Sequence, residues 1–122
     1  MIRATDTTAD LAEMIETLER VMPLFGKDNQ IGVTARPGVE DPISDAVGWI
    51  PDGVEETEYS DVTEPFRGTV FERLLRELPF AYGRTRLMRM RPKSCLSIHA
   101  DLTRRYHFAL VTNPGCYIVE VA

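Results

Sequence analysis

The spacing of apolar residues changes once along this 122-residue chain, near Thr85, and this change limits the folds that the chain can adopt. Over residues 8–25 and 66–78, apolar residues recur every three or four positions, which is typical of amphipathic helices. After Thr85, apolar and polar residues alternate, which is typical of strands with one buried face. The pattern therefore predicts an α+β protein in which helices precede a run of antiparallel strands.

Two amphipathic helices are predicted in the first part of the chain. One spans residues 8–25, and Thr7 or Thr8 is expected to cap its start. The other follows Thr63 as its N-cap and carries its apolar stripe over residues 66–78. Both apolar stripes are interpreted as faces that pack on the core, with no chemistry of their own.

Short strands are predicted on both sides of the second helix. They are expected at residues 30–35, 86–90, 95–99, 104–112 and 116–121. The turn Asn113-Pro114-Gly115 separates the last two of them. The final strand ends without a closing partner, and such an open edge can pair with a second copy of the chain. We expect one domain over residues 1–122, with a helical and loop part at about 1–83 and a β part at about 84–122.

Composition excludes several classes of function. The net charge of −5 argues against nucleic acid as the main partner. The acidic stretch 52–64, which holds no basic residue, is interpreted as a solvated face. No apolar run approaches a membrane span and no signal peptide is visible, so a cytoplasmic protein is expected, with Cys95 and Cys116 reduced and half-buried. The single tryptophan, Trp49, is expected to pack against the core.

His99 and Asp101 lie two residues apart at the end of a predicted strand. On an extended backbone both side chains point to the same face and can converge on one ion. An imidazole nitrogen, a carboxylate oxygen and a second histidine form the facial triad of non-haem Fe(II) oxygenases. On the next predicted strand, Arg105 and His107 share a face, and a guanidinium fork suits a carboxylate. A lone His-x-Asp pair is more often a solvated turn, but the Arg105 and His107 pair on the next strand favours a metal centre beside an anion site.

Two segments resemble the aspartyl/asparaginyl β-hydroxylase-like branch of the Fe(II)/2-oxoglutarate-dependent oxygenases, in particular its small bacterial and phage members. They are LMRMRPKSCLSIHAD at 87–101 and RYHFALVTNPGC at 105–116, in about the last third of the chain. The resemblance implies N-terminal helices packed on an antiparallel double-stranded β-helix, that is, a jelly-roll or cupin-like fold, incomplete in this chain.

The same resemblance implies a site and a reaction. His99 and Asp101 would be iron ligands, and Arg105, with His107, would bind a carboxylate of 2-oxoglutarate. Such a dioxygenase consumes O₂ and 2-oxoglutarate, releases CO₂ and succinate, and hydroxylates a substrate. The substrate class stays open among a peptide, a free amino acid and another small molecule.

The resemblance also implies a second histidine ligand beyond the Asn113-Pro114-Gly115 turn, whereas this sequence holds only His99 and His107. Three explanations remain open. The sequence is a fragment of a longer protein, or it is a truncated relative without catalysis, or His107 is the second nitrogen ligand and another subunit closes the barrel. The leading hypothesis, which rests on His99 and Asp101 followed by Arg105 and His107, is a hydroxylase. The alternative is a catalytically inactive relative that acts as a protein-binding or assembly module, with its open sheet edge as a route to a homo-oligomer.

Overall fold

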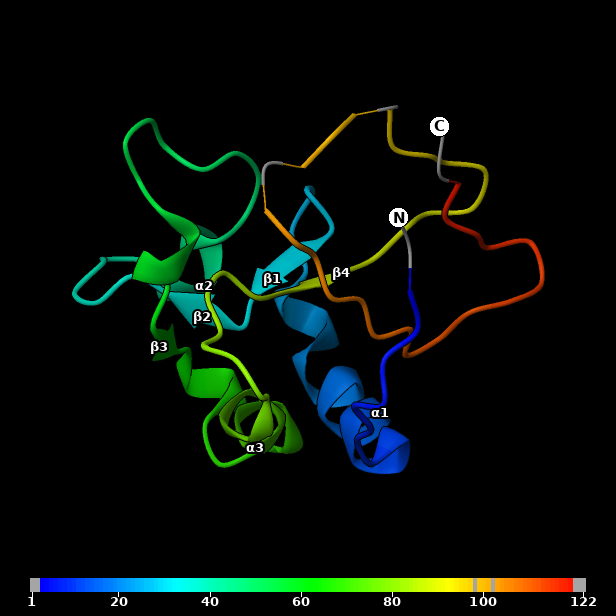
Figure 1. Ribbon diagram of the computed structural model, residues 1–122, viewed down its shortest axis with the longest axis horizontal. Helices are drawn as coiled ribbons and strands as arrows, with labels where there is room; N and C mark the ends of the chain where they lie inside the picture. The colour runs from blue at the N-terminus through cyan, green and yellow to red at the C-terminus, as the bar shows by residue number, and fades with distance from the viewer. Residues whose placement is uncertain (1–2, 98, 102, 120–122) are drawn as a thin grey trace.

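Short helices and two small antiparallel sheets form the fold of the described residues, which are 3–97, 99–101 and 103–119 of a computed structural model (Figure 1). The α-helices are α1 (Leu11–Val21), α2 (Pro42–Asp45) and α3 (Val70–Glu77). The strands are β1 (Gln30–Gly32), β2 (Thr34–Ala35), β3 (Asp61–Val62) and β4 (Arg86–Met88). Single 3₁₀ turns lie at Met22–Leu24, Glu56–Glu58 and Glu64–Phe66. The predicted mixture of helices and antiparallel strands is confirmed.

One extended segment supplies strands to both sheets. β1 pairs antiparallel with β4, with Ile31 opposite Leu87, while β2 pairs antiparallel with β3, with Thr34 opposite Val62. The sequence predicted a single strand over 30–35, but the chain changes partners at Val33. The amides of Val33 and Thr34 both donate to the carbonyl of Thr85, at 2.9 and 3.2 Å, and this shared acceptor marks the change from one sheet to the other.

Helix α1 begins later than its apolar stripe predicted. Its N-cap is Asp10, whose Oδ1 accepts from the amide of Glu13 at 3.2 Å, so the expected threonine cap at Thr7 or Thr8 is wrong. A carboxylate at this position also lies favourably at the positive end of the helix dipole. Pro23 then lies in the 3₁₀ turn that ends the helix.

The second predicted helix is divided by a glycine. Thr63 precedes only the 3₁₀ turn Glu64–Phe66, and its side chain makes no capping bond there. Gly68 has φ of +71°, a left-handed conformation that L side chains rarely adopt, and it turns the chain out of the helical path. Thr69 starts the helix again, because its hydroxyl accepts from the amide of Phe71 at 3.3 Å.

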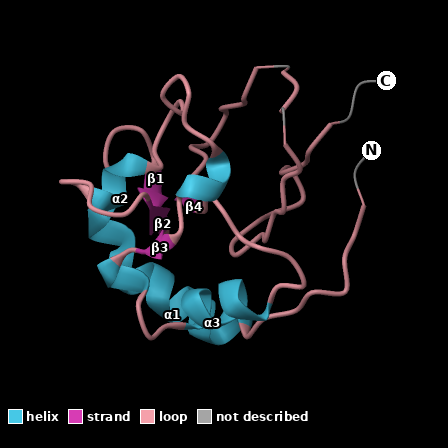
Figure 2. Cartoon of the chain, turned by 60° about the vertical axis from the view of Figure 1, so that its left-hand side comes forward, coloured by secondary structure: helices cyan, strands magenta, loops and turns pink. Residues whose placement is uncertain are grey.

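The core lies between the helix pair and the two sheets. Helices α1 and α3 contact each other below the strands in Figure 1, and Figure 2 shows them side by side along one edge of the molecule. The residues packed together are Met14, Val21, Ile31, Val33, Val62, Phe66, Val70, Phe71, Leu74, Leu75 and Leu87. The apolar stripe of α3 thus faces the core as predicted, whereas the stripe over residues 8–25 does so in part, because Leu11 and Met22 are exposed. None of the helices among the described residues has the length and apolar character needed to cross a membrane.

The described residues after β4 form no strand, so the strands predicted at 95–99, 104–112 and 116–121 are wrong for those residues. Alternation of apolar and polar residues produces a strand only where another strand supplies hydrogen bonds and a second layer covers the apolar face. No strand of the described residues pairs with this segment, and Leu96 and Tyr117 are exposed. Within the described ranges the two sheets close no barrel. The predicted positions Ile98 and 120–121 lie outside the described residues.

Three local predictions have clear outcomes. The Asn113-Pro114-Gly115 turn is confirmed, because the amide of Cys116 donates to the carbonyl of Asn113 at 2.9 Å. Trp49 does not pack: its side chain lies at the surface and the residue is 97% exposed. Cys95 and Cys116 are free, as expected, but exposed rather than half-buried.

Candidate metal and carboxylate site

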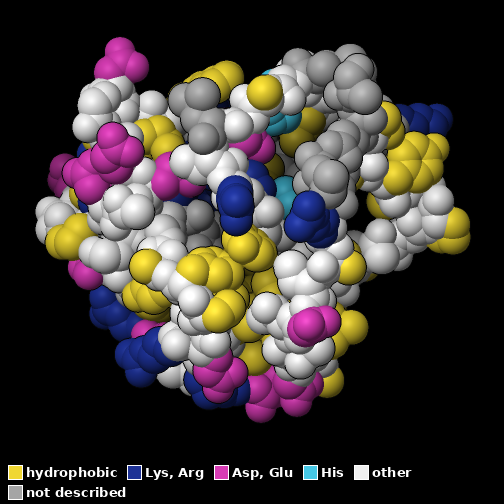
Figure 3. All heavy atoms as spheres, viewed as in Figure 1, with side chains coloured by type: hydrophobic (Ala, Val, Ile, Leu, Met, Phe, Trp, Pro, Cys, Tyr) yellow, Lys and Arg dark blue, Asp and Glu magenta, His cyan; other side chains and the backbone are white. Residues whose placement is uncertain are grey.

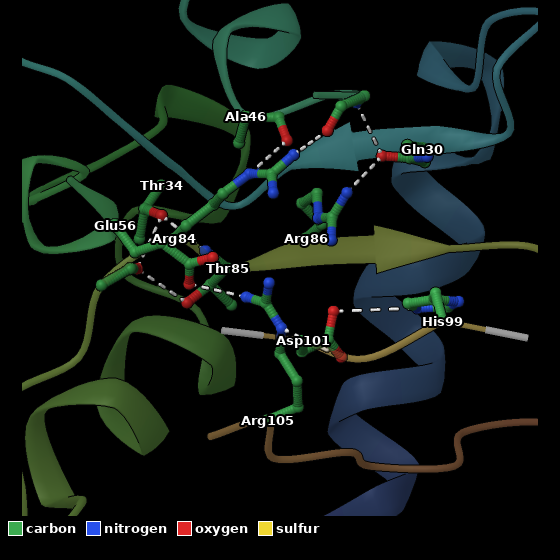
Figure 4. A network of polar contacts seen from close by, with 12 residues as sticks. Gln30, Thr34, Ala46, Glu56, Arg84, Thr85, Arg86, His99, Asp101 and Arg105 are labelled. Atoms are coloured by element: carbon green, nitrogen blue, oxygen red, sulfur yellow. Dashed lines mark hydrogen bonds and ion pairs between the residues drawn. The ribbon is translucent and has the colours of Figure 1, made fainter. Parts of the chain in front are cut away.

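The four predicted site residues follow β4 on a loop that passes back beside the start of that strand. Figure 4 shows His99, Asp101 and Arg105 on this loop, near Glu56 and the arginines of residues 84–86. On the face shown in Figure 3, basic side chains lie at the centre and histidine side chains lie close to them. The loop thus brings acid, imidazole and guanidinium groups together without a regular strand.

The imidazole of His99 faces the carboxylate of Asp101. Its Nε2 lies 3.7 Å from Asp101 Oδ1, so the two side chains that the spacing predicted to share a face do so. On the other side of the ring, Nδ1 lies 2.7 Å from the carbonyl oxygen of Ser97. Because a carbonyl oxygen can only accept, Nδ1 carries the hydrogen, and in the neutral ring Nε2 presents a lone pair to the carboxylate. Two lone-pair atoms that face each other favour a cation between or beside them.

Arg105 joins this pair to an acidic residue from the middle of the chain. Its Nη1 donates to Glu56 Oε2 at 2.6 Å, and its Nε lies 3.4 Å from Asp101 Oδ2. Partial burial opposes the charge on the guanidinium, but the hydrogen bond and charge of Glu56, followed by Asp101, outweigh it and raise the pKa of Arg105. Arg105 is therefore a fixed cation whose fork is oriented by two carboxylates.

A close backbone contact places Glu56 at this site. The amide of Arg84 donates to the carbonyl of Glu56 at 3.0 Å, next to Gly83. A Cβ atom at position 83 would lie 2.6 Å from that same carbonyl oxygen, so only glycine allows the two segments to approach this closely. Thr34 holds the same segment from β2, because its hydroxyl donates to the carbonyl of Gly83 and accepts from the amide of Thr85.

The donor set fits part of an iron site. Atoms bound at right angles to one small metal ion lie about 3 Å apart, given bond lengths of about 2.1 Å. The 3.7 Å between His99 Nε2 and Asp101 Oδ1 thus needs only a small side-chain adjustment. Within the described ranges, no group of three or more His, Cys, Asp or Glu side chains gathers at one point. His107 is exposed, and in the part of the chain that the structure describes no hydrogen bond or ion pair joins it to these residues.

Sequence reasoning missed several members of this network, among them Glu56, Gln30 and Arg86. Glu56 was interpreted as part of a solvated acidic stretch, yet it pairs with Arg105 across 49 positions of sequence. Gln30 on β1 and Arg86 on β4, whose side chains are hydrogen-bonded although Arg86 lies opposite Gly32, carried no predicted role. The available signal was the density of arginines after Tyr82, which is the only basic concentration beside the predicted metal ligands.

Comparison with known proteins adds no assignment: no protein-family model matches the chain, and no curated protein matches it.

Proposed function

We propose that the chain is an Fe(II)/2-oxoglutarate-dependent hydroxylase of the aspartyl/asparaginyl β-hydroxylase-like type, for which the resemblance implies a double-stranded β-helix of the jelly-roll kind. The observation that carries the proposal is the pairing of His99 Nε2 with Asp101 Oδ1, while Nδ1 is held by the Ser97 carbonyl. A histidine that ligates a metal commonly donates its other ring N–H to a carbonyl or carboxylate, which fixes the tautomer.

Each residue has a separate role in this proposal. His99 and Asp101 hold the iron, which when bound supplies the activation of O₂. Arg105 binds a carboxylate of 2-oxoglutarate through its fork, and Glu56 keeps that fork in place from the side away from Asp101. His107 adds a second donor to this carboxylate, as the resemblance implies. The substrate is a peptide, an amino acid or another small molecule.

Metal binding by defined variants tests the proposal. Calorimetry under anaerobic conditions with Fe(II), and with Mn(II) as a redox-stable probe, should detect binding that His99→Ala and Asp101→Ala each abolish. Asp52→Asn, which changes an exposed carboxylate in the acidic stretch, serves as the matched control. Metal at about 100 times its Kd should raise the free energy of unfolding by about 2.7 kcal/mol.

Turnover supplies the second readout. In the presence of O₂, Fe(II) and 2-oxoglutarate together should yield CO₂ and succinate, the second of which mass spectrometry detects, and Arg105→Gln should raise the 2-oxoglutarate concentration that is required. If the chain binds neither metal nor 2-oxoglutarate, the hydroxylase proposal is wrong.

An exposed apolar run favours one alternative, an inactive relative that assembles with a second copy. Tyr117, Ile118 and Val119 are 78%, 63% and 72% exposed, so three consecutive apolar residues lie open to a partner. In this alternative the run pairs with its equivalent in another chain. Size-exclusion chromatography at two concentrations would then give a metal-free oligomer that Ile118→Lys converts to a monomer. A monomer that binds iron would instead support the hydroxylase.

A further inference from the structure

Three guanidinium groups gather around the start of β4, on Arg84, Arg86 and Arg105 (Figure 4). Arg84 donates through Nε to the carbonyl of Ala46 at 2.9 Å and through Nη2 to that of Gly48. Arg105 pairs with two carboxylates, as described above. The Arg84 and Arg105 side chains therefore have defined structural partners.

Arg86 differs from both neighbours. Its Nη1 donates to the amide oxygen of Gln30 at 2.9 Å, and among the described residues its side chain makes no ion pair with a carboxylate. That same oxygen also accepts from the amide of Gly48 at 3.1 Å, so Gln30 binds a backbone amide as well as the Arg86 side chain. A guanidinium has five N–H donors, of which this bond uses one.

The electrostatic balance around Arg86 favours an added anion. Burial, followed by the like charges of Arg84 and Arg105, lowers the pKa of Arg86 to about 10, so the group is still cationic at neutral pH. Among the residues that the structure describes, these three cations face two carboxylates, Glu56 and Asp101, and both carboxylates are bound to Arg105. A half-buried cation beside like charges is unfavourable unless an opposite charge joins it.

We propose that Arg86 is the cation of a second anion subsite, next to Arg105, that binds a carboxylate of a small acid. The fork of Arg86 suits two parallel hydrogen bonds to a planar carboxylate better than a single bond to an amide. The subsite requires no iron. Its link to the site above rests on the proposed function, in which Arg105 holds one carboxylate of 2-oxoglutarate. The carboxylate at Arg86 then belongs either to the far end of that diacid or to an acidic substrate.

Ligand binding to the full chain without metal tests the subsite. With EDTA present, calorimetric titrations use 2-oxoglutarate, the monoacid pyruvate, and L-aspartate added at saturating 2-oxoglutarate. Arg86→Gln keeps a polar side chain near Gln30, and Arg86→Lys keeps the charge without the fork. Arg76→Gln on α3 is the control, because Arg76 is exposed and its ion pair is with Glu72 on the same helix. Circular dichroism and thermal unfolding establish that each variant is folded.

The expected pattern separates the two sources of the carboxylate. If it is the far end of 2-oxoglutarate, Arg86→Gln weakens 2-oxoglutarate binding by about 10- to 100-fold, as expected for loss of a charge-assisted hydrogen bond, and leaves pyruvate unchanged. If it belongs to the substrate, Arg86→Gln weakens only the binding of L-aspartate. Arg86→Lys should restore part of either loss.

The subsite and the hydroxylase proposal can fail separately. Folded Arg86→Gln protein that binds 2-oxoglutarate and L-aspartate as the wild type does would show that Arg86 only anchors β4 to Gln30, and would overturn the subsite. If Arg86→Gln itself does not fold, the folded Arg86→Lys variant decides, because loss of the fork should still weaken binding several-fold. Binding that depends on Arg86 but occurs without iron-dependent succinate formation would keep the subsite and reject the hydroxylase.

Discussion

Replacement of Thr34 by valine tests whether one hydroxyl holds the arginine-bearing segment against β2. Thr34 is fully buried, and its Oγ1 donates to the carbonyl of Gly83 at 3.0 Å and accepts from the amide of Thr85 at 2.8 Å. Valine has nearly the same shape, so Thr34→Val opens no cavity and removes only these two bonds.

The cost follows from what each lost bond leaves behind. The Thr85 amide is left without this acceptor, and an unsatisfied buried donor costs about 1–3 kcal/mol. The Gly83 carbonyl still accepts from the Thr85 hydroxyl at 3.1 Å. It therefore loses only the hydrogen bond from Thr34, an ordinary bond that contributes about 1 kcal/mol. Thr34→Val should therefore lower the free energy of unfolding by about 2–4 kcal/mol, out of a total of about 5–15 kcal/mol.

Urea and thermal unfolding followed by circular dichroism measure this difference. An unfolding entropy of about 2.1 cal/mol/K per residue converts the loss into a fall in Tm of about 8–15 °C. Thr85→Val, which removes only the bond to Gly83, should cost about 1 kcal/mol, and Thr57→Val at an exposed position should cost less than about 0.5 kcal/mol. A Thr34→Val protein as stable as the Thr57→Val control would refute the reasoning.

Three further predictions concern the core, an ion pair and the surface. Phe66→Ala should lower the free energy of unfolding by about 3–5 kcal/mol in urea titrations, because the buried ring packs edge-on against Phe71 at 5.4 Å; a loss below about 1 kcal/mol would contradict this packing. The hydrogen bonds from Arg36 lower the pKa of Asp45 below its ordinary value of 3.8, so this carboxylate stabilises the fold above that pH and the gain is lost as pH falls through the folded pKa. Asp45→Asn should therefore be less stable than wild type at pH 7, and the two proteins should converge at the lowest pH where both are folded; a constant difference across the acid range would reject the linkage. Iodide should quench the fluorescence of Trp49 equally in folded and urea-unfolded protein, and Trp49→Ser should change stability by less than about 0.5 kcal/mol, whereas strong protection of the folded state would place the ring in a contact.

The two long helices could be predicted because their information is local. A stripe at helical spacing identifies a helix and its buried face from neighbouring residues alone, and α1 and α3 lie within the predicted ranges. Their ends depend on single side chains, and the competition between Asp10 and the preceding threonines could not be decided from spacing. The predicted and observed helix boundaries therefore differ where two residues of similar capping ability lie close together.

The predicted strands after Arg91 failed for a different reason. Alternation states which side chains would share a face, but a strand needs hydrogen bonds from a partner, and pairing is not encoded within the segment itself. The same limit applies to the site. The approach of His99 to Asp101 follows from a spacing of two, whereas the pairing of Glu56 with Arg105, 49 positions apart, depends on how the chain between them folds.

Because the chain changes partners at Val33, the strand pairing in one sheet depends on the strand pairing in the other. Strand β1 pairs with β4 and strand β2 pairs with β3, yet both belong to one short stretch of backbone with Val33 between them. A shift of that stretch by one position would turn every side chain on it to the opposite face. A wrong pairing register in one sheet would therefore also disrupt the register of the other. The amides of both strands should accordingly exchange with deuterium through one shared opening event, at a single free energy.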